Sequence, residues 1–238
     1  MSATKRFNVG VTGILLGLAA AAWYLAASGI VGMGAMEISV PLYLATWLVM
    51  LVAMMFPAVA PIVRTFARVA SARTDGGLVV AGFVLGYLIV WMAAGVVPLF
   101  LYLGSQGLIA GMFATTLGSF AIGAVLLAAG IYQFSPWKSI CLRACRSPLG
   151  FVLNHDFGGG WRRAFRAGAS HGAFCLGCCW ALMSVLVVVG LMNLAWMAAL
   201  SVLFLAEKNW RHGAGLSRVA GGTFALAGLL VVAGQALL

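Results

Sequence analysis

The chain has 238 residues, of which 64% are hydrophobic and only 8% are charged, and its formal net charge is +10. A mean hydropathy of +1.10 excludes a soluble globular domain. The positive charge does not indicate nucleic-acid binding, because no soluble patch of interleaved basic and aromatic residues accompanies it. The predicted fold class is all-α, a polytopic bundle of transmembrane helices.

The uncharged tracts of the sequence predict where the chain crosses the membrane, since one span needs about 20 apolar residues. The tracts are residues 7–36, 38–63 and 219–238 with one span each, and 76–137 and 167–206 with two spans each. We therefore expect about seven spans in a single transmembrane domain, residues 1–238. The turn near 190–193 leaves the sixth span short.

The basic residues predict the orientation of the bundle. With seven spans, all 14 lysines and arginines lie on one side of the membrane. The positive-inside rule makes that side cytoplasmic, so the N-terminus lies inside and the C-terminus outside. The expected location is the bacterial cytoplasmic (inner) membrane, crossed several times. Because five cysteines are an odd number on the cytoplasmic side, structural disulfides are not expected.

Within 38–63, two methionines and two prolines stand close together. Pro57 and Pro61 each remove a backbone donor, which usually kinks a helix. Met54 and Met55 precede them and offer thioether sulfur, a soft ligand. Methionine is also a common filler of helical cores, so the pattern alone leaves both roles open.

Small residues recur at a spacing of four, at Gly13 and Gly17 and again at Gly82 and Gly86. That spacing lets two helices approach closely in a membrane. A chain with 31 glycines also produces it by chance, so the pattern does not fix a contact.

Residues 135–170 form the longest polar stretch and are predicted as a cytoplasmic interfacial loop that carries a cysteine pair. Cys141 and Cys145 are four residues apart, and the bases near them favour thiolate. Such a pair could bind metal, form a disulfide or remain inert. Near the end of the sixth span, the carboxylate of Glu207 is expected to pair with a base, and Lys138, Arg143 and Arg146 are the candidates.

The strongest functional signal lies in the fifth span. Residues three and four apart share a helix face, and this face includes His171, Cys175, Cys178, Cys179 and Met183. Thiolate and thioether select Cu(I), and imidazole also suits Zn(II). With a helix that begins near position 171, the thiols would lie roughly 6 to 12 Å from its start. The alternative is that these cysteines fill helix contacts.

At these residues the chain resembles bacterial domain-of-unknown-function family 2182, described as predicted metal-binding integral membrane proteins. The resemblance covers most of the chain after the first span. It implies a multispan protein that binds a metal, without an established reaction. The residues that carry it are Met54-Met55, Pro57, Pro61, Tyr132-Gln133, Pro136, Lys138, Cys141, Cys145-Arg146, Pro148, Cys175-Leu176-Gly177-Cys178-Cys179-Trp180, Met183, Met192-Asn193 and Glu207-Lys208.

The sequence therefore predicts a soft-metal protein, with Cu(I) ahead of Zn(II), that acts in transport or delivery. Its expected partners are the lipid bilayer and either a metallochaperone or a larger membrane complex. No catalytic residue is assigned. Two other functions stay open: a non-catalytic accessory subunit of a larger membrane complex, and a thiol oxidoreductase. The predicted metal residues are Cys175, Cys178 and Cys179 as primary ligands, Cys141 and Cys145 as an auxiliary pair, His171 as a fourth ligand, and Met54, Met55 and Met183 as a feeder path.

Overall fold

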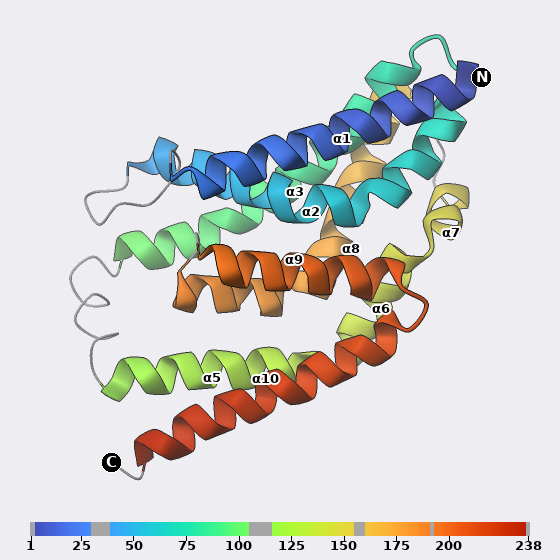
Figure 1. The fold of residues 1–238 in the computed structure, drawn as a ribbon. Helices are drawn as coiled ribbons and strands as arrows, with labels where there is room; N and C mark the ends of the chain where they lie inside the picture. Colours follow the sequence, from blue (N-terminus) through green and yellow to red (C-terminus); the bar gives the residue numbers. More distant parts are fainter. Residues whose placement is uncertain (1–2, 30–38, 105–115, 155–159, 191–192, 237–238) are drawn as a thin grey trace.

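The computed structural model describes residues 3–29, 39–104, 116–154, 160–190 and 193–236 (Figure 1). These ranges contain helices and connecting turns and no strand. Met192 and residues 155–159 of the predicted interfacial loop lie outside them. The helices are α1 (Ala3–Ala27), α2 (Val40–Ala70), α3 (Gly76–Gly104), α5 (Thr116–Tyr132), α6 (Pro136–Arg146), α7 (Pro148–Leu153), α8 (Gly160–Val189), α9 (Leu194–Asn209) and α10 (Gly213–Ala236).

The helices pack in pairs around a shared core. α1 lies along α2, α3 along α8, and α5 along α10 (Figure 1). α2 is the most deeply buried of the long helices, whereas α1 and α10 expose most of their apolar surface. The described ends of α1 and α10 that lie nearest the two termini are at opposite ends of the bundle (Figure 1).

Five helices are long and apolar enough to span a membrane: α1, α2, α3, α8 and α10. A sixth span is formed if α5 and α6, which meet at a bend of 64°, are counted as one. α9 corresponds to the predicted short span, and it has 16 residues. A polytopic helical protein is thus confirmed within the described ranges, while the count of seven spans stays a prediction.

The predicted interfacial loop, residues 135–170, is helical over most of its described length. It contains α6, α7 and the first turns of α8. Ser135 starts α6, because its side chain accepts a hydrogen bond from the Lys138 amide and Pro136 fits the first turn. Because α8 begins at Gly160, the thiols from Cys175 to Cys179 lie roughly 22 to 28 Å along it. The predicted distance from the start of the helix is therefore wrong.

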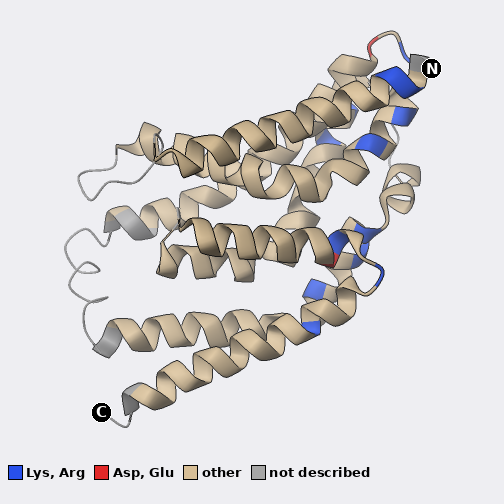
Figure 2. Cartoon of the chain, in the orientation of Figure 1, with Lys and Arg blue, Asp and Glu red and all other residues tan. Residues whose placement is uncertain are grey.

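Lysines and arginines of the described ranges gather at one end of the bundle, which we call the basic end (Figure 2). There the turn from α2 to α3 holds an ion pair, with Arg73 Nε 2.7 Å from Asp75 Oδ1. The hydrogen bond from Arg73 lowers the pKa of the Asp75 carboxyl below its ordinary value. The gathering of bases agrees with the charge pattern of the sequence. Which side of the membrane this end faces stays a prediction.

Small residues bring α3 and α8 into close contact. A Cβ built on Gly86 would overlap the backbone oxygen of Phe165, and one on Gly168 would overlap that of Phe83. Gly13 and Gly17 on α1, by contrast, have no atom within 4 Å of a Cβ position. The spacing of four therefore marks a tight contact on α3 and none on α1. The close approach matters because the next residue on α3, Tyr87, reaches the thiols of α8.

A side chain of α1 replaces the backbone hydrogen bond that Pro57 removes from α2. Pro57 has no amide hydrogen, so it cannot donate to the carbonyl oxygen of Ala53 one turn earlier. The indole Nε1 of Trp23 on α1 donates to that oxygen instead, at 3.0 Å. A neighbouring helix thereby satisfies a polar group that would be costly to leave bare in hydrocarbon.

Candidate metal centre

Four of the five thiols meet between α6 and α8. Cys145 Sγ lies 3.8 Å from Cys178 Sγ, and Cys178 Sγ lies 3.4 Å from Cys179 Sγ. Cys178 Sγ also lies 3.1 Å from the backbone oxygen of Cys175, one turn earlier. Cys145 is 7% exposed, and the three thiols of α8 are at most 1% exposed. All five cysteines of the chain are free thiols.

These distances are compatible with sulfur ligands that share an ion. Two thiolates bound to one tetrahedral ion at about 2.3 Å, the length of a zinc–thiolate bond, lie about 3.8 Å apart. The Cys145–Cys178 pair has that separation, and the Cys178–Cys179 pair is slightly closer. Across the described ranges, however, no group of three or more histidine, cysteine, aspartate or glutamate side chains is already arranged around an ion position. Binding by more than two sulfurs requires the thiols to shift.

A buried lysine contacts the same cluster. Lys208 on α9 is 7% exposed, and its Nζ donates to Cys175 Sγ at 2.9 Å. The ammonium also lies 6.0 Å from the centre of the Phe204 ring, within range of a cation–π interaction. A charge buried among apolar helices is costly unless it is paired. The contact with Lys208 therefore favours a negative sulfur at Cys175.

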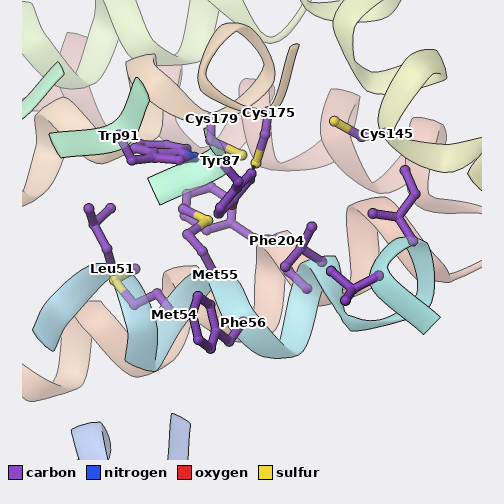
Figure 3. Packing of buried hydrophobic residues seen from close by; sticks show 14 of the residues in the cluster. Leu51, Met54, Met55, Phe56, Tyr87, Trp91, Cys145, Cys175, Cys179 and Phe204 are labelled. Atoms are coloured by element: carbon purple, nitrogen blue, oxygen red, sulfur yellow. Dashed lines mark hydrogen bonds between the residues drawn. The ribbon is translucent and has the colours of Figure 1, made fainter. Parts of the chain in front are cut away.

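Two aromatic side chains of α3 surround the buried sulfurs from the other side. Tyr87 Oη lies 3.1 Å from Cys175 Sγ, so this sulfur is in contact with a phenol as well as an ammonium. Trp91 is 1% exposed, and its Nε1 has no hydrogen-bond partner among the described residues. Figure 3 shows its indole nitrogen on the side that faces Cys179. Trp91 thus supplies a buried indole N–H that has no partner among the described residues.

An ion pair next to the cluster joins α6 to α9. Lys138 Nζ lies 2.7 Å from Glu207 Oε2, and these side chains are 1% and 0% exposed. Arg146 donates to the backbone oxygens of Glu207 and Arg211. The structure thus selects Lys138 from the three bases that the sequence offered to Glu207, and both partners are buried.

Cys141 and His171 lie near the cluster but outside the group of touching thiols. Cys141 is on α6, is only partly buried, and its sulfur packs against Gly177. The ring of His171 lies among aromatic rings, stacked on Phe83 and Tyr87 at centroid distances of 6.1 and 6.0 Å. The assignment of His171 as a fourth ligand stays a prediction.

The three predicted feeder methionines are all buried but differ in direction. Met54 and Met55 are fully buried on α2, and Met183 on α8 is 5% exposed. Figure 3 shows the sulfur of Met55 turned toward Cys175 and Cys179, and that of Met54 turned toward Leu51. Of the two methionines drawn there, only Met55 presents sulfur to the thiol cluster.

Sequence reasoning missed the polar neighbours of the sulfurs: Lys208, Tyr87 and Trp91. Lys208 carried a signal, because a lysine beside Glu207 in an apolar helix must either reach the surface or find a buried partner. Nothing in the sequence distinguishes Tyr87 or Trp91 from other aromatic residues of the bundle. Their role follows from the contact between α3 and α8.

Comparison with known proteins places the chain in a family. Neither a curated protein nor a solved structure matches it. The model of a family described as PpoB2, copper chaperone, matches residues 44–231, a stretch that contains all five thiols and Lys208. This match supports a copper-related role, and it does not bear on the name of family 2182. The chain belongs to the PpoB2 copper chaperone family.

Proposed function

We propose that this protein binds Cu(I) within the bacterial inner membrane, through Cys145, Cys175, Cys178 and Cys179, and hands it on in copper transport or delivery. The observation that carries the proposal is the contact of Cys178 with both Cys145 and Cys179, at 3.8 and 3.4 Å. Soft thiolate ligands select Cu(I), and membership of a copper chaperone family points to the same metal.

The charges around the cluster favour a monovalent ion over Zn(II). Two thiolates and one Cu(I) carry a net charge of −1, which the ammonium of Lys208 balances. Two thiolates with Zn(II) are already neutral, so the same lysine leaves an excess positive charge in an apolar interior. Zn(II) would need a third buried thiolate, and each further buried charge is costly.

The remaining predicted residues have supporting roles in this proposal. Met55 turns its thioether toward the thiols and is the favoured step of a methionine path, with Met54 and Met183 as further buried steps. His171 is a fourth ligand to the three thiols of α8 when the thiols shift and copper leaves Cys145. The basic end faces the cytoplasm, so the centre is reached from inside.

The test is a Cu(I) titration of detergent-purified protein under anaerobic conditions, in competition with a chromogenic Cu(I) chelator. We expect the wild type to bind Cu(I) and Cys178→Ser to bind it at least about tenfold more weakly, because the variant removes the sulfur that touches both others. Ser184→Ala is the matched control, since the Ser184 hydroxyl bonds within its own helix, to Ala181.

Equal and weak binding by the wild type and Cys178→Ser would overturn the proposal. If such metal-free protein also co-purified with a stoichiometric membrane partner, the accessory-subunit function would replace it. A change in free-thiol count under mild oxidant, without copper binding, would favour the oxidoreductase.

A further inference from the structure

The five thiols differ in their access to the surroundings. Cys141 is partly exposed, Cys145 is 7% exposed, and the three thiols of α8 are essentially buried. Cys141 and Cys145 are one turn apart on α6, so their side chains lie on the same face. One face of α6 therefore carries a partly exposed thiol, Cys141, and one turn later Cys145, which joins the buried cluster.

The sulfur of Cys141 has a defined position on α8. A Cβ built on Gly177 would lie 2.6 Å from Cys141 Sγ, so only a glycine leaves room for this sulfur at that point. Gly177 immediately precedes Cys178, the thiol that touches both Cys145 and Cys179. The hydroxyl of Tyr132 on α5 donates to the Gly177 oxygen at 2.6 Å and fixes the backbone there. Three helices thus hold Cys141 beside the cluster.

We infer that Cys141 is the exchange thiol of the metal centre, through which Cu(I) passes between a thiol-bound carrier and the buried cluster. This inference rests on the proposed function. The buried thiols cannot touch a carrier, because three of them are at most 1% exposed and Cys145 is 7% exposed. A Cu(I) complex with two thiolates is an anion, and the exposed Arg143 on the same helix favours its approach.

The transfer is a ligand exchange without a change of oxidation state. In the first step one of the two copper–sulfur bonds to the carrier breaks as the bond to Cys141 Sγ forms, and the thiol proton of Cys141 passes to the departing carrier sulfur. In the second step the bond to Cys145 Sγ forms, the bond to Cys141 breaks, and the Cys145 proton returns to Cys141. In the third step the bond to Cys178 Sγ forms as the bond to the second carrier sulfur breaks, and the Cys178 proton passes to that sulfur, which leaves. Copper remains Cu(I) throughout.

The rate and the extent of copper loading test this inference separately. The probe is Cu(I) in an excess of glutathione, mixed rapidly with purified protein. We expect Cys141→Ser to reach the wild-type ratio of copper to protein, but to load at least about tenfold more slowly. Gly177→Ala keeps all five thiols, and we expect it to load slowly as well, because the added methyl displaces the Cys141 sulfur. Ser139→Ala, an exposed position on the same helix, should load at the wild-type rate.

The outcomes of the loading experiment distinguish failure of the exchange role from failure of the proposed function. Loading of Cys141→Ser at the wild-type rate would overturn the inference and leave the proposed function intact. Loss of copper at equilibrium in Cys141→Ser would also overturn it, since Cys141 would then be a ligand of the resting centre. Absence of copper from the wild type would overturn the proposed function and, with it, the exchange role.

Discussion

The sulfur of Cys175 is in contact with two helices other than its own, through an ammonium from α9 at 2.9 Å and a phenol from α3 at 3.1 Å. A thiol that served only as an apolar filler would be surrounded by hydrocarbon. Two polar groups on one buried sulfur indicate a negative charge that the surrounding helices are built to stabilise. At the scale of single residues, Lys208 and Tyr87 therefore belong to the centre as much as the cysteines do.

Replacing Lys208 by methionine should weaken Cu(I) binding by about ten- to a hundredfold, since a hydrogen bond to a charged group contributes about 1.5–3 kcal/mol. Lys208→Arg retains the positive charge and should recover part of that loss. The chelator competition measures both variants. An affinity for Cu(I) that is unchanged in Lys208→Met would remove the lysine from the centre.

At the scale of helices, charged groups as well as apolar packing fix the position of α6 against α9. The buried pair of Lys138 and Glu207 joins it to α9, and Arg146 adds bonds to the backbone at the end of α9. This placement brings Cys145 to Cys178. The geometry of the thiol cluster therefore depends on an ion pair that is not part of it.

Glu207→Gln should lower stability by about 3 kcal/mol, because it leaves the ammonium of Lys138 buried without a counter-charge. Removing both charges, as Lys138→Met with Glu207→Leu, should restore most of the loss. Melting of the purified variants in detergent checks this order. The prediction is wrong if the double variant melts no higher than Glu207→Gln.

The sequence predicted that thiols of two segments meet, because two simple patterns were enough. The spacing of Cys175, Cys178 and Cys179 places them on one helix face, and the charge distribution places Cys145 at the same end of the bundle. The rotation of each helix about its own axis was not predictable. It depends on contacts such as Gly86 with Phe165 and Lys138 with Glu207, and it decides that Cys145 joins the cluster while Cys141 stays at the edge.

At the scale of the whole molecule, the bundle has one basic end and long apolar helices between its ends (Figure 2). Large hydrophobic side chains such as Ile14, Tyr24 and Leu230 are exposed on α1 and α10. A membrane would cover them, whereas water would not tolerate so much exposed apolar surface. The orientation predicted from the bases is accessible to a direct test.

Two introduced cysteines should respond differently to a membrane-impermeant maleimide in intact cells. Ser28→Cys, at the far end of α1, should be labelled at once, and Thr74→Cys, at the basic end, only after permeabilisation. Both are made in a Cys141→Ser background, in which the native thiols that remain are buried and serve as the unlabelled control. The reverse pattern would place the basic end outside.

The hydrogen bond from the Trp23 indole to the Ala53 backbone oxygen has a consequence for the insertion of the chain into the membrane. A nascent chain emerges with its N-terminal segments first, so the indole on α1 enters the bilayer before α2. The carbonyl oxygen of Ala53, which Pro57 leaves without a backbone donor, can thus bond to Trp23 as soon as α2 inserts. Membrane insertion then needs no intermediate in which this oxygen lies in lipid without a hydrogen bond.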